Sequence, residues 1–165
     1  ALTLAPGNAL NPRDVTAALA GQDAVLIALG AGRKGHVRAA GTANLIDAMK
    51  THGLRRLICE TTLGAGDSRP LLNFFWKRIM FGLLLRPAYA DHLAQEKSVE
   101  SSELDWTIVR PAAFTNGPRT QTYKHGFPNT QRNLKLKISR SDVADFMLKQ
   151  LSSQVYLQKA PGLSY

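Results

Sequence analysis

Continuous apolar runs of strand length recur along the chain, separated by polar or glycine-rich turns. The runs at residues 24–29, 54–59 and 106–109 are apolar at most positions, which is typical of strands buried on both faces of a parallel sheet. Weaker patterns predict three further short strands, at residues 1–5, 134–137 and 155–157.

Between these runs, apolar residues recur at helical spacing. Asn11 followed by Pro12 predicts a helix start, because asparagine caps helices and proline suits their first position. Ser139 predicts a second N-cap. Longer helices are predicted at residues 37–49, where Gly53 provides the C-cap, and 87–102.

Strands that alternate with helices of these lengths predict an α/β fold. We expect a Rossmann-like parallel sheet flanked by helices, in one domain of 165 residues. In such sheets ligands bind beyond the carboxyl ends of the strands. Pro111 should end the third main strand near Arg110, so residues 112–117 are a candidate site wall. A plain core strand with a tight exit explains the same residues equally well.

Composition narrows the possible functions. Hydrophobic residues make up 44% of the chain and its formal net charge is +9, which favours a globular protein with anionic partners. Cys59 is the single cysteine and is expected to be a small buried hydrophobe. The four histidines lack metal-ligand spacing, so no metal site is predicted. Asp91, His92 and Glu96 are expected on a solvated helical face rather than as an acid/base pair, with a helix that borders the substrate side as the alternative.

Two segments stand out from this background. Residues 71–85 are strongly apolar but too short and too charged at the centre to span a bilayer, so no stable membrane insertion is predicted. The segment suits a buried core element, a lid over the substrate, a homo-oligomer interface or a membrane-surface helix. A core element or an interface is expected, because an element that is hydrophobic all round is usually buried. The basic segment 119–140 is either a solvated face or a mouth that attracts an anionic ligand. It lacks a series of interleaved exposed aromatic residues and any nucleic-acid-binding motif, so nucleic acid is not a predicted partner.

Residues 21–25, 41–50, 104–111 and 138–146 occur in the same order in a known group. The chain resembles the atypical short-chain dehydrogenase/reductases, the NAD(P)H-binding reductases similar to biliverdin-IXβ/flavin reductase and to the nitrogen-metabolite-repression regulators. The resemblance extends over nearly the whole chain. It implies a Rossmann-type sheet that binds NADP or NAD.

The resemblance also implies positions for the cofactor. It places Asn8 and Ala9 beside the adenine and Thr62 near the nicotinamide. Thr62 is our candidate catalytic residue, acting as a hydrogen-bond relay, with protonation from solvent as the alternative. The remaining cofactor-binding candidates follow the predicted strands: Leu29, Gly30, Arg33, Thr61, Pro111, Ala112, Ala113 and Phe114.

The sequence departs from the family in two ways. The glycine-rich G-x-x-G-x-x-G turn, whose backbone N–H groups hold the pyrophosphate, does not occur in these 165 residues. We therefore expect the sheet to lack the family's first two strands, and the isolated chain to bind NADPH very weakly. There is no Tyr-x-x-x-Lys pair, and Ala113 stands where biliverdin-type members have histidine.

Two functions are compatible with these observations. The first is an NAD(P)H-dependent reductase that passes hydride to a flavin, quinone or carbonyl-type small molecule. The second is a non-catalytic NAD(P)-sensing regulatory or binding protein of the same fold. Because no secretory signal is found and cysteine is scarce, a cytoplasmic location is expected for either one.

Overall fold

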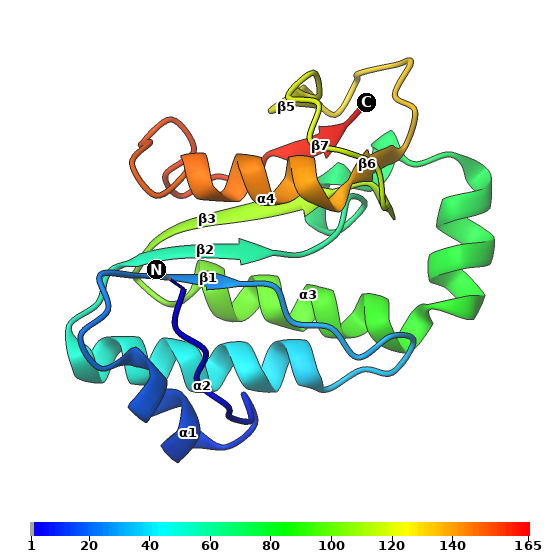
Figure 1. Cartoon of the computed structure of the whole chain (residues 1–165). Helices are drawn as coiled ribbons and strands as arrows, with labels where there is room; N and C mark the ends of the chain where they lie inside the picture. Colours follow the sequence, from blue (N-terminus) through cyan, green and yellow to red (C-terminus); the bar gives the residue numbers. More distant parts are fainter. Residues whose placement is uncertain (1) are drawn as a thin grey trace.

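The computed structural model describes residues 2–165 as layers of helices around a central sheet (Figure 1). The helices are α1 Pro12–Leu19, α2 Val37–His52, the 3₁₀-helix η1 Gly66–Leu71, the π-helix η2 Phe75–Leu84, α3 Arg86–Glu100 and α4 Arg140–Lys149. The strands are β1 Ala24–Ile27, β2 Arg56–Glu60, β3 Asp105–Pro111, β4 Ala113–Thr115, β5 Lys124–His125, β6 Lys137–Ser139 and β7 Gly162–Ser164.

The main sheet has the strand order β1-β2-β3-β7-β5. Its pairs are parallel except that of β7 with β5, and β4 pairs with β6 in a separate parallel ladder. Helices α2 and α3 cover one face, with α1 outside α2, and α4 covers the other face (Figure 1). The predicted Rossmann-like parallel sheet flanked by helices is confirmed. Within residues 2–165, β1 pairs only with β2.

Strand β2 divides the hydrophobic core into two parts because successive side chains point to opposite faces of a sheet. Leu57 and Cys59 belong to the cluster beneath α1 and α2, while Ile58 belongs to the cluster beneath α4. All three side chains are fully buried. Cys59 is thus the buried small hydrophobe that its apolar neighbours predicted.

The predicted helix caps are confirmed by hydrogen bonds. The Asn11 side chain accepts from the backbone N–H of Arg13, and the Ser139 side chain accepts from that of Asp142. Gly53 ends α2 with a left-handed φ of 71°, a conformation that glycine adopts without steric cost.

Two predicted strands are wrong. In the range 1–5, Ala1 lies outside the described residues and residues 2–5 form no strand, since no neighbouring strand supplies hydrogen-bond partners. Residues 155–157 belong to a turn closed by the bond from Leu157 N–H to the Gln154 carbonyl. The last strand is instead β7, which is buried between β3 and β5.

Two boundaries also differ from the prediction. The strand expected at residues 134–137 is β6, which begins only at Lys137, where β4 becomes available as a partner. Strand β3 includes Pro111 rather than ending at Arg110. Proline lacks only the donor, and the Pro111 carbonyl still accepts from Leu63 N–H.

The apolar segment 71–85 splits into a buried and an exposed part. Leu71 and Leu72 are buried, whereas η2 has no buried residue. The expectation of a core element is therefore wrong for η2. Helix η2 directly precedes α3 in the chain and lies at one side of the molecule (green at the right of Figure 1). Only part of its circumference contacts the rest of the chain.

Candidate functional site

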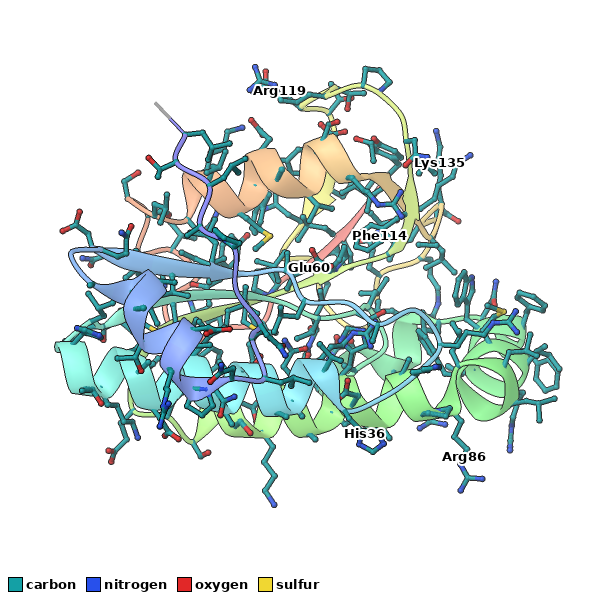
Figure 2. The ribbon with its side chains drawn as sticks, turned by 60° about the horizontal axis from the view of Figure 1, so that its bottom comes forward. His36, Glu60, Arg86, Phe114, Arg119 and Lys135 are labelled. Carbon is teal, nitrogen blue, oxygen red and sulfur yellow. The ribbon has the colours of Figure 1, made fainter. Side chains whose placement is uncertain are left out.

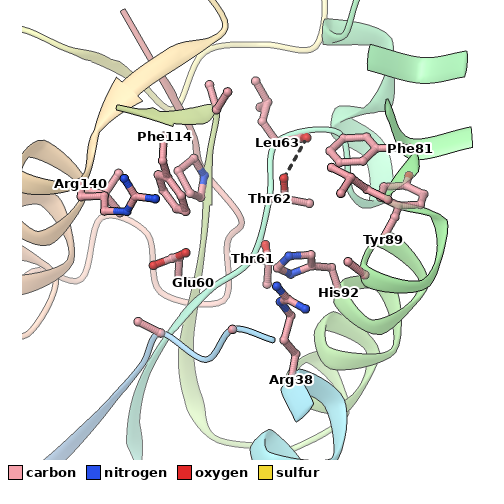
Figure 3. Close-up of a pocket in the computed structure, with 18 of the residues that line it drawn as sticks. Arg38, Glu60, Thr61, Thr62, Leu63, Phe81, Tyr89, His92, Phe114 and Arg140 are labelled. Carbon is pink, nitrogen blue, oxygen red and sulfur yellow. Dashed lines mark hydrogen bonds between the residues drawn. The ribbon is translucent and has the colours of Figure 1, made fainter. Parts of the chain in front are cut away.

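A pocket of about 620 Å³ opens beyond the carboxyl ends of β1, β2 and β3. Its walls come from the strand exits together with η2, α3 and α4 (Figure 3). This is the position at which parallel α/β sheets bind ligands, and the volume is that of an ordinary small-molecule site.

The pocket gathers most of the residues predicted to bind the cofactor. Eight predicted site residues line it: Leu29, Gly30, Thr61, Thr62, Pro111, Ala112, Ala113 and Phe114. They come from three segments far apart in the sequence, and the parallel register of β1, β2 and β3 brings them to one edge.

Asn8, Ala9 and Arg33 are not part of this lining. Asn8 forms a turn: its side chain accepts from Leu10 N–H, and its own N–H donates to Asp14 Oδ2 at 2.9 Å. The carbonyl of Ala9 accepts from the side chain of Asn44, which fixes this turn on α2.

The two threonines at the exit of β2 have different surroundings. The Thr61 hydroxyl is buried and donates to Glu96 Oε1 at 2.7 Å. Thr62 is half-buried and makes only a long contact of 3.4 Å to the carbonyl of Leu63 (Figure 3). Of the two hydroxyl groups, that of Thr62 is the freer to bond a ligand in the pocket.

A buried ion-pair network holds this exit in place. Arg110 of β3 donates to both carboxylate oxygens of Glu96, at 2.9 and 2.8 Å, and also pairs with Asp67. Because Glu96 also accepts from Thr61, α3 and the ends of β2 and β3 are connected through one carboxylate. Arg110 and Glu96 therefore hold in place the strand ends that form the pocket, and they are not free to bind a ligand.

Glu60 is a titratable group inside the pocket. It is the last residue of β2 and points toward the wall that carries Phe114 and Arg140 (Figure 3). Burial raises the pKa of Glu60 to about 7, although Arg38 and Arg140 act to lower it. Near neutral pH the carboxyl group is thus present in both protonation states.

His92 lies on the opposite side, beside Thr61 and Arg38 (Figure 3). Burial, and then the nearby charge of Arg38, lower its pKa to about 4, so the imidazole is neutral at pH 7. Its Nδ1 has no hydrogen-bond partner among residues 2–165. A neutral imidazole offers one donor and one acceptor without a charge.

The neighbours of His92 correct the expected solvated face. Asp91 and Glu96 are buried, not solvated. Asp91 accepts from the backbone N–H groups of Arg38 and Ala39, both at 3.0 Å, and so caps the start of α2. Both carboxylates are hydrogen-bonded to other residues of the fold, and His92 is the one of these three residues that lines the pocket.

The rest of the lining is largely apolar and aromatic. On one side, Phe81 stacks on Tyr89 with ring centres 4.7 Å apart, and the Tyr89 hydroxyl donates to the Gly64 carbonyl. On the other, the Arg140 guanidinium lies 5.0 Å from the ring centre of Phe114. The pocket therefore suits a flat, mainly apolar group that also meets positive charge.

Sequence reasoning did not assign Arg38, Glu60 or His92 to the site, and it named Arg140 only as the end of the basic segment 119–140. Glu60 had a usable signal, since it directly precedes Thr61 at a strand exit. His92 and Arg140 are helical residues whose orientation depends on how α3 and α4 pack. Between residues 2 and 165 the structure holds no cluster of three His, Cys, Asp or Glu able to bind a metal ion. Within the same range, no helix is long and apolar enough to cross a membrane.

Comparison with known proteins places this chain in a family. A family model described as NAD(P)H-binding matches residues 1–154, which is nearly the whole chain. The chain belongs to this NAD(P)H-binding family. The predicted resemblance to an NAD(P)H-binding family is confirmed, and the cofactor of that family is NADP or NAD.

Curated relatives are longer than this chain. It is 27% identical over 144 residues to the UPF0659 protein YMR090W of Saccharomyces cerevisiae, with 84% of the chain and 60% of that protein covered. It is 29% identical over 150 residues to an uncharacterized sugar epimerase, YhfK, of Bacillus subtilis, with 87% and 64% covered. The chain thus spans somewhat less than two thirds of the length of these relatives.

Solved structures show the same fold. The anaerobillin reductase ChuY of Escherichia coli is 26% identical, with a TM-score of 0.75 over 95% of this chain and 72% of that one. A short-chain dehydrogenase/reductase of Veillonella parvula in complex with NADP is 18% identical, with a TM-score of 0.76 over 96% and 70%.

The residues present fit the nicotinamide half of NAD(P)H. Gly30 leaves open space at the exit of β1, where an added Cβ would meet only Arg38 Nη2, at 3.9 Å. Pro111, Ala112 and Phe114 provide an apolar wall of the kind that a flat ring requires. Asn8 and Ala9, the residues assigned to the adenine, are not part of the lining of this pocket, and the glycine-rich pyrophosphate motif is not in these 165 residues.

Proposed function

We propose that this chain carries the nicotinamide and substrate pocket of an NAD(P)H-dependent reductase that passes hydride to a flavin, quinone or carbonyl-type small molecule. One observation carries the proposal. At the exits of three parallel strands, an apolar pocket places the freer hydroxyl of Thr62 and the neutral imidazole of His92 on its lining. The largely apolar walls favour such acceptors over a sugar.

When bound, the dihydronicotinamide supplies the hydride. The protein's residues orient the acceptor and exclude water. Leu72, Trp76 and Phe81 cover the site with apolar surface, which strengthens polar interactions inside it. Thr62 Oγ1 donates a hydrogen bond to an acceptor oxygen or nitrogen on which charge develops, and the neutral His92 ring offers a second donor.

The basic lining residues favour an acceptor that carries negative charge. Arg38 and Arg140 approach the pocket from α2 and α4. Arg38 is paired with the buried carboxylate of Asp91, so Arg140 contributes most of the field that attracts an anionic ligand. This field is screened by salt over about 8–10 Å near physiological ionic strength. We place this activity in the cytoplasm, because the single cysteine is buried and free, as in proteins of reducing compartments.

The test is oxidation of NADPH and NADH by the natural protein that contains these residues, with flavin, quinone and carbonyl acceptors offered in turn. Thr62→Ala is expected to lower kcat roughly tenfold or more, as loss of a positioned donor often does. Thr51→Ala is a matched control, since Thr51 is exposed and bonds only within α2.

The outcomes separate the two functions. Turnover that falls in Thr62→Ala but not in Thr51→Ala supports the reductase. Unchanged kcat and KM in Thr62→Ala would remove Thr62 from the site. Tight NADPH binding, measured by calorimetry, without oxidation by any acceptor class would favour the non-catalytic NAD(P)-sensing protein instead.

A further inference from the structure

The helix η2 exposes apolar side chains that the pocket does not use. Phe74, directly before it, is 73% exposed, Phe75 is 52% exposed and Leu83 is 70% exposed. Ile79 and Leu84 add further exposed apolar surface on the same helix. Large contiguous apolar patches on a protein surface mark interaction sites.

The π-helical winding gathers these residues on one side. The hydrogen bonds of η2 run from residue i to i+5, as from Leu85 N–H to the Met80 carbonyl at 2.7 Å. At roughly 4.4 residues per turn, as such bonding gives, four exposed apolar residues fall within an arc of about 80°: Phe75, Ile79, Leu83 and Leu84. In an α-helix of 3.6 residues per turn, the same four would spread over about 180°.

This apolar stripe lies among basic residues. Arg78 belongs to the same helix, at the border of the stripe, and Arg86 lies just after η2. Arg69 belongs to η1, where its guanidinium lies 5.9 Å from the ring centre of Tyr89. All three are exposed, and Arg86 points away from the body of the protein (Figure 2). None of them forms an ion pair with any residue in the range 2–165. From Ser68 to Ala90 the sequence contains no acidic residue.

The charges decide what can cover the stripe. Two copies of this face would bring like charges together, with no carboxylate between residues 68 and 90 to offset them, so self-association is opposed. A bilayer that contains anionic lipids offers hydrocarbon for the stripe and negative headgroups for the arginines. Apolar and basic faces side by side are the pattern of helices that lie in the membrane interface.

We propose that η2 docks this protein on the surface of an anionic lipid bilayer, with Phe75, Ile79 and Leu83 in the interface and Arg78 and Arg86 at the headgroups. The contact is peripheral, since the stripe covers one side of a ten-residue helix. Trp76 and Phe81 of the same helix line the pocket, so the docked face lies beside a wall of the site.

The test is co-sedimentation of the 165-residue chain with vesicles of phosphatidylcholine alone or of phosphatidylcholine with about one third phosphatidylserine. Binding is expected to the anionic vesicles and at least tenfold weaker to the neutral ones, and it should weaken as salt rises. Replacing Arg78 and Arg86 by glutamine should lower the partition coefficient by roughly fivefold for each arginine.

The apolar contribution has its own variant and control. Phe75→Ser with Leu83→Ser should lower binding by tenfold or more. Leu148→Ser with Val155→Ser is the matched control, because these side chains are similarly exposed, at 59% and 66%, but lie elsewhere. Lys50→Gln with Lys97→Gln controls for net charge, since both lysines are exposed on other helices. Circular dichroism verifies that each variant is folded.

Three results would overturn the proposal. One is equal binding to neutral and anionic vesicles, and another is binding that the control pairs reduce as much as the η2 variants do. The third is no vesicle binding together with a concentration-dependent dimer, seen by light scattering, that Phe75→Ser with Leu83→Ser disrupts. In that case a second copy of the chain, not lipid, covers the stripe.

Discussion

Glu60 should make the stability of the fold depend on pH. Its carboxyl group lies at the end of β2 inside the pocket, where burial disfavours the charged form. Arg38 and Arg140 offset only part of that cost, and no side-chain hydrogen bond reaches the carboxylate within residues 2–165. Replacing the group by the neutral amide in Glu60→Gln should remove the penalty.

The magnitude follows from the pKa of Glu60. Burial raises it from 4.5 to about 7. At about 1.4 kcal/mol per tenfold change in proton affinity, the full effect is about 3 kcal/mol. Because the pKa of Glu60 is higher in the folded state than in the unfolded state, protonation of Glu60 favours the folded state. This contribution to the free energy of unfolding is fully present below about pH 4.5 and is lost as pH rises through about 7.

The assay is urea unfolding of wild type and Glu60→Gln at pH 5 and at pH 8.5, followed by circular dichroism. Relative to wild type, the free energy of unfolding of Glu60→Gln should be about 2 kcal/mol higher at pH 8.5 than at pH 5. Glu100→Gln is the control, since Glu100 is exposed at the end of α3. If the difference between Glu60→Gln and wild type were the same at both pH values, the burial argument would be refuted.

Two further predictions concern buried groups near the site. Arg110→Met should lower the free energy of unfolding in urea by about 3–5 kcal/mol, because it leaves the buried Glu96 carboxylate without its partner. Arg55→Met, at the exposed pair with Asp105, should lower it by less than about 1 kcal/mol. Equal losses in the two variants would contradict the role of burial. The Cys59 thiol is fully buried, and burial raises its pKa. A thiol reagent should therefore modify Cys59 only after denaturation. Rapid labelling of the folded chain would show that the core around β2 opens.

The sequence by itself determined the elements whose signals are local. Asn11 with Pro12, Ser139 and Gly53 set helix ends because each acts on the backbone within one turn. Apolar runs determined the three main strands, since a strand buried on both faces needs apolar residues throughout. The strand exits then follow, and with them the placing of Thr62 and Ala112 at one edge of the sheet.

Tertiary structure alone decided which side chains face the pocket and which surfaces stay open. His92 and Arg140 reach the pocket because α3 and α4 pack on opposite faces of the sheet, and no local pattern encodes that packing. The apolar segment before α3 predicted burial, but a hydrophobic run specifies only that it avoids water, not which partner covers it. Its π-helical winding, which turns a scattered pattern into one exposed stripe, depends on backbone geometry that residue types do not determine.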